Sequence, residues 1–341
     1  MSTMKTNRFT PAQITEAAAL LKAGEVVAFP TETVYGLGAI ATDPKAVAKV
    51  FAAKHRPADN PLIVTVATTA MVAEYATITP AAQQLMTVFW PGPLTIILPV
   101  LPGRLPAVVT GGLSTAAFRL PASAVTRDLI AATGVPIVGP SANLSTKPSA
   151  TKAEHVLHDF DGVIAGVVDA GPTPVGVEST VIDMTVTPPA ILRPGKLGPA
   201  DLEPIIGPVQ ADHHHVAAGE TPKAPGMKYK HYAPAAQVVI VDAPADWPAA
   251  LAWAKASGTA YGVLASPAIL ATVPSGVPTY ALGGDIQAAT HNLFAGLRWF
   301  DLHPSVSLVL AQAYPATGLG AAYMNRLDKS AGGRHFAQEQ A

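Results

Sequence analysis

Cysteine is absent from all 341 residues of the chain. Its absence excludes disulfide bonds, thiolate nucleophiles and metal sites built on cysteine. Long apolar runs are also missing, because the longest, residues 96–101 and 306–311, are too short to cross a bilayer. The first ten residues contain no apolar signal region. From these absences we expect a cytoplasmic protein that makes no contact with a membrane.

Charged and aromatic residues are scarce as well. They make up 13% and 6% of the chain, and the formal net charge is -1. Up to residue 207 there are 14 basic and 15 acidic residues, and beyond it there are 8 of each. Proteins that bind nucleic acid over a large surface carry an excess of Lys and Arg, and single-strand binders space aromatic rings for base stacking. The composition therefore leaves room only for a small basic patch and a weak RNA contact.

Apolar residues, in contrast, are plentiful: they make up 49% of the chain, enough for a sizeable core. At roughly 150 residues per domain, the length corresponds to about two domains. Apolar periodicity stops between residues 208 and 236, a segment that contains four prolines and three consecutive histidines at 213–215. Consecutive histidines in a regular backbone do not converge on one ion, so we interpret the segment as a linker. The predicted domains are 1–207 and 237–341, joined by a linker or lid at 208–236.

Strand-like and helical patterns alternate in both predicted domains. Thr10-Pro11, Asp43-Pro44 and Thr79-Pro80 are typical helix starts. The alternation predicts an α/β protein: an N-terminal domain with a twisted mixed sheet and a central ligand cleft, and a smaller C-terminal three-layer, Rossmann-like α/β domain. The predicted helices are 11–22, 44–54, 80–89, 125–132, 153–159, 247–257, 285–302 and 321–330, and the predicted strands are 26–29, 62–66, 95–100, 116–120, 136–138, 163–168, 180–184, 190–193, 238–242, 261–265, 279–282 and 306–311.

Lys54, Arg56 and Asn60 precede an apolar strand and form the first candidate site. Arg presents a planar fork of donors and Lys a compact charge, a combination that suits phosphate. The alternative is a pair of cations placed against the dipole at a helix C-terminus, which accounts for Lys54 better than for Arg56. We favour phosphate binding for this cluster.

Further polar clusters lie at strand ends, where α/β folds bind ligands. Thr33 lies in residues 30–38, a segment with a second threonine, a carboxylate and two glycines, which suggests either close approach of the backbone to a small molecule or an ordinary turn. Arg119 lies inside an apolar strand and needs a partner, either an internal carboxylate or an anionic ligand. We favour a ligand carboxylate for Arg119.

The turn at 140–145, which contains Ser141, offers hydroxyls and backbone N–H groups that can hold an anion, and Ser149 lies just beyond it. A simple capped turn is the alternative. Ser179 and Arg193 mark two more strand ends, although Arg193 also fits a surface ion pair. Motifs typical of P-loop, dinucleotide-binding, serine hydrolase and zinc peptidase sites are absent from the sequence.

With these clusters in order along the chain, the sequence resembles the threonylcarbamoyl-AMP synthases in their longer, two-domain form. The resemblance covers nearly the whole chain. Each motif is weak alone, and the ordered set is highly specific. The matching segments are residues 30–38, 54–64, 90–98, 114–121, 140–149, 176–183, 191–195, 224–234 and 318–329.

The resemblance implies an enzyme, a nucleotidyltransferase, that makes L-threonylcarbamoyladenylate and pyrophosphate from L-threonine, bicarbonate and ATP, with Mg²⁺ carried by the ATP phosphates. Other proteins, the tRNA-modifying threonylcarbamoyl transferase machinery, would use the product on an adenosine beside the anticodon. The implied L-threonine site consists of Thr33, Thr65, Arg119, Gly139 and Ser179. The implied ATP site consists of Lys54, Arg56, Asn60, Thr115, Ser141, Ser149, Arg193 and Tyr232, with Tyr232 in the linker so that the linker can close over the nucleotide.

Two positions depart from the family pattern. Members usually carry histidine where this chain has Thr65, and glycine is common where it has Lys147. Thr65 can donate and accept a hydrogen bond but cannot carry charge. This leaves open a carbamoyl-adenylate enzyme that uses a different amine. A non-catalytic RNA-binding module is the other alternative, and the balanced charge of both halves argues against it.

Overall fold

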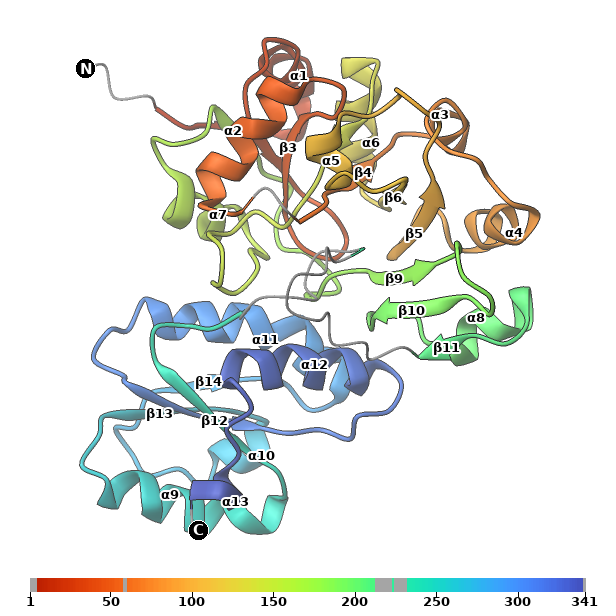
Figure 1. Cartoon of the computed structure of the whole chain (residues 1–341). Helices are drawn as coiled ribbons and strands as arrows, with labels where there is room; N and C mark the ends of the chain where they lie inside the picture. Colours follow the sequence, from red (N-terminus) through yellow and green to blue (C-terminus); the bar gives the residue numbers. More distant parts are fainter. Residues whose placement is uncertain (1–4, 58–59, 212–222, 224–231, 340–341) are drawn as a thin grey trace. The chain divides into compact units, whose positions relative to one another are not determined.

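The protein is described by a computed structural model that covers residues 5–57, 60–211, 223 and 232–339 (Figure 1). It divides into two compact units. The first comprises Met1–Ser145, Ala150–Pro174 and Glu178–Lys228, and the second comprises Thr146–Ser149, Val175–Val177 and Tyr229–Ala341. Outside the described residues lie 58–59 of the 54–64 segment and, within the predicted linker at 208–236, residues 212–222 and 224–231, which include the three consecutive histidines.

The first unit is built on an 11-stranded sheet. Parallel and antiparallel pairs are both present: β4 (Ile63–Thr65) and β6 (Thr115–Arg119) run parallel, whereas β6 and β5 (Leu94–Pro99) run antiparallel. The mixed sheet predicted from the sequence is therefore confirmed. The strands, in spatial order, are β1 (Asn7–Phe9), β8 (Gly166–Val168), β2 (Val27–Phe29), β3 (Gly36–Ile40), β7 (Ile137–Val138), β4 (Ile63–Thr65), β6 (Thr115–Arg119), β5 (Leu94–Pro99), β9 (Thr180–Asp183), β10 (Ala190–Arg193) and β11 (Gln210–Ala211).

Helices cover both faces of this sheet, and the alternation of side chains along β2 shows how. Ala28 packs into a core cluster with residues of α2 (Pro44–Lys54), α4 (Pro80–Phe89) and α7 (Ala153–Phe160). Val27 and Phe29 pack into another cluster with residues of α1 (Ile14–Lys22) and α6 (Ala124–Thr133). Successive strand residues point to opposite faces, so both faces of β2 are buried. The helices of this unit are η1 (Pro11–Gln13), α1 (Ile14–Lys22), α2 (Pro44–Lys54), α3 (Thr69–Ala73), α4 (Pro80–Phe89), α5 (Ala107–Thr110), α6 (Ala124–Thr133), α7 (Ala153–Phe160) and α8 (Pro199–Ile206).

Strand β3 corrects the interpretation of residues 30–38 as a loop or turn. A Cβ on Gly36 would lie 2.4 Å from Cζ of Phe29, and one on Gly38 would lie 2.9 Å from the carbonyl oxygen of Val27. The ring of Phe29 fills the space that the missing side chains leave. The close approach that the two glycines permit is therefore an approach to Phe29, not to a small molecule.

The second unit contains a parallel sheet of four strands, β12 (Gln237–Val241), β15 (Leu308–Gln312), β13 (Tyr261–Ala265) and β14 (Thr279–Ala281), in that order. Figure 1 shows α11 (Ile286–Asp301) and α12 (Leu319–Ala331) on one side of the sheet. It shows α9 (Trp247–Ala256), α10 (Pro267–Leu270) and α13 (Phe336–Glu339) on the other side. This confirms the predicted smaller three-layer α/β fold. The helices are η2 (Pro244–Asp246), α9 (Trp247–Ala256), α10 (Pro267–Leu270), α11 (Ile286–Asp301), α12 (Leu319–Ala331) and α13 (Phe336–Glu339).

Candidate functional site

Three of the residues predicted to bind threonine converge at one end of β4 and β6. Thr65, the last residue of β4, pairs with Arg119, the last residue of β6. Thr65 also pairs with Ile137 of β7, and the antiparallel register continues to Gly139, whose N–H donates to the carbonyl oxygen of Ile63 at 2.9 Å. A Cβ on Gly139 would lie 2.5 Å from Oγ1 of Thr65. The absence of a side chain on Gly139 therefore allows its backbone to approach the Thr65 hydroxyl.

Arg119 has an internal partner as well as an unused donor. Its Nη2 lies 2.8 Å from Oε1 of Glu32, and both side chains are about nine-tenths buried. Among the described residues, Nε of Arg119 has no hydrogen-bond partner although it is buried. Glu32 is itself fixed, because its Oε2 accepts a hydrogen bond of 3.0 Å from the N–H of Ala122. The sequence left an internal carboxylate and a ligand as alternatives; the carboxylate is present, and one guanidinium N–H is available in addition.

Thr33 is connected to this cluster through its neighbour Thr31. The two hydroxyl oxygens lie 2.9 Å apart, and Nη2 of Arg119 lies 3.5 Å from Oγ1 of Thr31. Thr33 is fully buried. A short chain of hydrogen-bonding groups therefore runs from Thr33 to the guanidinium.

Ser179 lies at the start of β9 and is held from two sides. Its Oγ lies 2.7 Å from Oγ1 of Thr95, and Arg193 donates from Nε to the Ser179 carbonyl oxygen and from Nη2 to the Ser179 hydroxyl, both at 3.1 Å. Because Ile96 pairs with Phe118, Thr95 lies beside Arg119 in the sheet. Arg193, predicted to bind ATP, thus contacts a residue predicted to bind threonine.

Lys54 ends α2 and is almost completely buried, with 2% of its surface exposed. Its Nζ donates to the carbonyl oxygens of Ser141 and, at 2.6 Å, of Asn143. The N–H of Ser145 in turn donates to the Lys54 carbonyl oxygen at 3.0 Å. Lys54 therefore lies at a helix C-terminus, as the alternative interpretation has it, and also fixes the turn that contains Ser141.

Arg56, Asn60 and Thr115 gather at the opposite end of β4 and β6. Nη2 of Arg56 donates to the carbonyl oxygens of Asn60 and Pro61, at 3.4 and 3.3 Å. Among the described residues, the buried Oδ1 of Asn60 has no hydrogen-bond partner. Since Ile63 pairs with Ala117, the register places Thr115 level with Pro61. At about 3.3 Å per residue, this group lies roughly 13 Å along β6 from the threonine-side residues.

Ser149 and Tyr232 belong to the second unit. Ser149 is fully buried, and Tyr232 is 5% exposed with its ring centroid 5.1 Å from that of Phe294 on α11. Tyr232 adopts a positive φ of 66°, which is uncommon for a residue with a side chain. Both residues therefore have defined surroundings within that unit.

Three polar residues that the structure adds to the site were not among the predicted site residues. Glu32 pairs with Arg119, Thr31 bridges to Thr33, and Thr95 contacts Ser179. All three lie in segments singled out from the sequence, 30–38 and 90–98. No local signal distinguished them, because the contacts that define their roles are made across the sheet.

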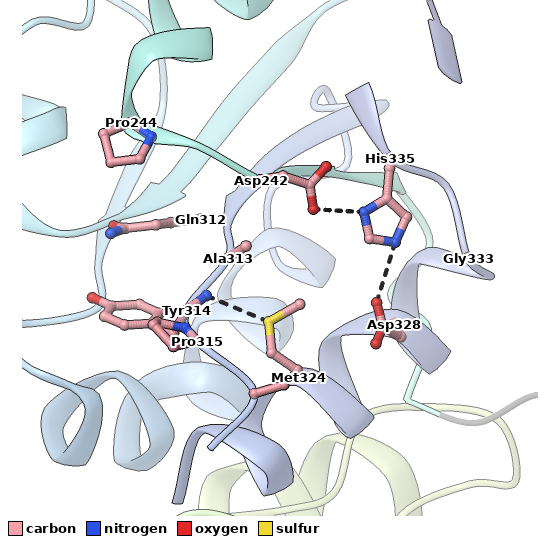
Figure 2. Close-up of a pocket in the computed structure, with 11 residues that line it drawn as sticks. Asp242, Pro244, Gln312, Ala313, Tyr314, Pro315, Met324, Asp328, Gly333 and His335 are labelled. Atoms are coloured by element: carbon pink, nitrogen blue, oxygen red, sulfur yellow. Dashed lines mark hydrogen bonds and ion pairs between the residues drawn. The ribbon is translucent and has the colours of Figure 1, made fainter. Parts of the chain in front are cut away.

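A separate cavity of about 640 Å³ lies in the second unit, beyond the carboxyl ends of β12 and β15 (Figure 2). His335 lies between two carboxylates there, with Nδ1 2.8 Å from Asp242 and Nε2 3.3 Å from Asp328. Burial raises the pKa of the Asp328 carboxyl above its usual value. None of the predicted site residues lines this cavity.

Among the described residues, no helix is both long enough and apolar enough to cross a membrane.

Known proteins match the chain over most of its length. A family model described as telomere recombination matches residues 19–195, and a model described as the C-terminal domain of threonylcarbamoyl-AMP synthase matches residues 198–332. The threonylcarbamoyl-AMP synthase of Bacillus subtilis is 46% identical over 325 residues, which cover 94% of each chain. That of Pyrococcus abyssi is 45% identical over 327 residues, covering 93% of this chain and 94% of the relative.

A crystal structure of P. abyssi Sua5 complexed with L-threonine has the same fold, with a TM-score of 0.90 and 42% identity over 97% of this chain and 98% of that one. The match includes both the large mixed sheet and the smaller parallel one. The chain therefore belongs to the threonylcarbamoyl-AMP synthase family, in its two-domain form.

Proposed function

We propose that this protein synthesises L-threonylcarbamoyladenylate from L-threonine, bicarbonate and ATP and releases pyrophosphate. The observation that carries the proposal is the convergence of Thr65, Gly139 and Arg119, with a buried guanidinium N–H that has no partner among the described residues. A buried donor without a partner costs free energy, which a carboxylate ligand would recover. Family membership and the L-threonine in the solved relative support threonine as that ligand.

In this proposal the threonine carboxylate binds Arg119, and the hydroxyls of Thr33, Thr65 and Ser179 and the backbone of Gly139 surround the rest of the amino acid. The threonine amine attacks bicarbonate and water leaves, which gives N-carboxythreonine. A carbamate oxygen then attacks the α-phosphorus of ATP, and the bond to pyrophosphate breaks. That oxygen is already ionised, so positioning and charge neutralisation supply most of the catalysis.

The phosphates of ATP would bind at the cationic end of the site. Arg56 offers a guanidinium, Asn60 an amide, and Thr115 and Ser141 hydroxyls. Lys54 holds the turn that contains Ser141 through hydrogen bonds to its carbonyl oxygens. Arg193, Ser149 and Tyr232 complete the set that the family resemblance implies. Positive groups of this kind stabilise the charge that builds up as the α-phosphorus is attacked.

Magnesium would arrive with ATP. The residues on the ATP side are cations, amides and hydroxyls, which suit phosphate oxygens better than a metal ion. Within the described residues, no three His, Asp or Glu side chains are placed to hold a metal. Mg²⁺ typically keeps several waters and binds through substrate phosphates, where it would neutralise charge on the leaving pyrophosphate.

The proposed product is a mixed anhydride that water hydrolyses. We propose that the linker carrying Tyr232 covers the nucleotide, and that the tRNA-modifying threonylcarbamoyl transferase machinery takes up the product in the cytoplasm. Exclusion of water from a reactive intermediate is a common purpose of such closure.

The test is pyrophosphate release from ATP and Mg²⁺, with threonine and bicarbonate omitted in turn. We expect release only when both are present. Release that is indifferent to threonine or to bicarbonate would contradict the proposed reaction.

Thr65 favours one alternative function, in which the protein carries out the same reaction with an amine other than threonine. A neutral hydroxyl stands where the family usually has histidine, so the pocket offers less charge for recognition. Serine, glycine and alanine in place of threonine distinguish the two candidates. A higher kcat/KM for another amino acid than for threonine would favour the second.

A further inference from the structure

We infer that helix α11 of the second unit positions the two chain segments that lead into the substrate residues, and that Arg298 is its principal contact. This inference rests on the proposed function, in which Ser149 binds ATP and Ser179 binds threonine. It gives the C-terminal part of the chain a defined role in substrate binding.

Arg298 fixes the peptide group immediately before Ser149. Its Nε and Nη2 both donate to the carbonyl oxygen of Pro148, at 2.9 and 2.6 Å. That carbonyl belongs to the peptide bond that joins Pro148 to Ser149. Arg298 is only 3% exposed, so these charge-assisted hydrogen bonds are shielded from water. The orientation of the backbone at Ser149 therefore depends on this side chain.

The same segment contacts other residues of the second unit at two further points. Nζ of Lys147 lies 3.5 Å from Oδ1 of Asp301, the last residue of α11. The carbonyl oxygen of Thr146 accepts a hydrogen bond of 2.8 Å from the N–H of Ala233, next to Tyr232. Residues 146–149 thus form a segment held along its length.

The second segment, residues 175–177, approaches α11 through Gly176. A Cβ on Gly176 would lie 2.4 Å from the carbonyl oxygen and 2.5 Å from Cα of His291, and the φ of Gly176 is +87°. Glycine is the residue that fits both this conformation and this contact. Two residues later the chain enters Glu178 and Ser179.

The contacts come from one face of α11. His291, Phe294, Arg298 and Asp301 are spaced three, four and three residues apart, which places them along one side of a helix. His291 lies against Gly176, Phe294 against Tyr232, Arg298 against Pro148 and Asp301 against Lys147. A single rigid element therefore contacts the segments before both substrate serines and the ring of Tyr232.

The contact of Arg298 with Pro148 and the contact of Gly176 with His291 predict different kinetic effects. Arg298→Gln removes the charge and one donor, so we expect KM for ATP to rise by about tenfold while KM for threonine changes by less than about twofold. Arg298→Lys keeps the charge and one donor and should recover part of the loss. Gly176→Ala should raise KM for threonine by about tenfold and KM for ATP less, because its segment leads to Ser179.

Matched controls separate positioning from general destabilisation. Arg334→Gln changes an exposed arginine of the same unit that pairs with Glu339, and Gly258→Ala changes a glycine with φ of +69° that has nothing within 4 Å of its Cβ position. Both should leave the two KM values unchanged. Thermal unfolding of every variant is measured alongside the kinetics.

The kinetic results distinguish failure of the proposed function from failure of the inference about α11. A wild-type enzyme without threonine-dependent pyrophosphate release contradicts the proposed function itself. An active wild type together with an Arg298→Gln variant whose two KM values stay within about twofold overturns the inference alone, as do equal losses for both substrates. If Arg298→Gln does not fold, Arg298→Lys and Gly176→Ala are compared instead. The inference then requires that KM for ATP rises more in the first variant and KM for threonine rises more in the second.

Discussion

At the scale of single residues, Arg119 shows how a buried charge can serve structure and ligand binding together. The ion pair with Glu32 offsets the cost of removing the guanidinium from water, and Glu32 is held by the N–H of Ala122. The unused Nε then remains available for a second anion. The sequence placed Arg119 in an apolar strand and so required a partner, but it could not identify Glu32, which lies 87 positions away along the chain.

Arg119→Lys tests the role assigned to the free N–H. Lysine keeps the positive charge but loses the planar fork, so it cannot contact Glu32 and a ligand carboxylate in the same way. We expect KM for threonine to rise by a factor equivalent to about 1.5–3 kcal/mol, with KM for ATP nearly unchanged. Steady-state kinetics with each substrate varied in turn measure both values. Arg104→Lys, the same change at an exposed arginine outside the site, is the control and should behave like wild type.

Asp169 should make stability depend on pH. Burial acts to raise the pKa of its carboxyl, but the hydrogen bond from the N–H of Gly171 and the ion pair with Arg8 outweigh burial and leave the pKa below its usual value. A carboxylate with a lowered folded-state pKa stabilises the protein above its unfolded pKa, and this contribution is lost as the pH falls through the folded pKa.

Asp169→Asn should therefore lower the free energy of unfolding at pH 7 by no more than about 1 kcal/mol, since the pair is partly exposed. The difference between variant and wild type should shrink below about pH 4. Urea unfolding at pH 7 and at successively lower pH measures it. A difference that grows on acidification would contradict the assignment.

At the scale of secondary structure, the elements that the sequence predicted best are those with local signals. Asp43 accepts hydrogen bonds from the N–H groups of Lys45 and Ala46, and Thr79 accepts one from Ala82, as their positions before proline indicate. Strand β3 was missed because Gly36 and Gly38 are typical of turns. Their place in a strand depends on the ring of Phe29 in β2, and such a contact has no local signature.

Gly36→Ala tests that explanation. The new Cβ would lie 2.4 Å from Cζ of Phe29, so we expect a loss of about 1–3 kcal/mol in the free energy of unfolding from overpacking. Combining it with Phe29→Leu should recover part of the loss, and a double-mutant cycle by urea unfolding measures the coupling. Gly198→Ala, where nothing lies within 4 Å, is the control. Additive effects of the two changes would contradict the proposed contact.

At the scale of the whole molecule, the ordered motifs predicted the family and the fold class, and both are confirmed. What the sequence could not predict is which residues act together in space. Residues 146–149 and 175–177 group with the second unit although they precede the predicted linker, because Arg298 and His291 contact them. Such contacts join positions more than 100 residues apart, and no periodicity or spacing records them.

The most direct test of the central claim is detection of the product itself. The protein would be incubated with ATP, Mg²⁺, L-threonine and ¹³C-labelled bicarbonate, and the mixture analysed by mass spectrometry at short times. We predict a species with the mass of threonylcarbamoyl-AMP that contains one ¹³C atom and does not form when threonine is omitted. Consumption of ATP without such a species, or a labelled adduct of another amine in preference to threonine, would contradict the assignment.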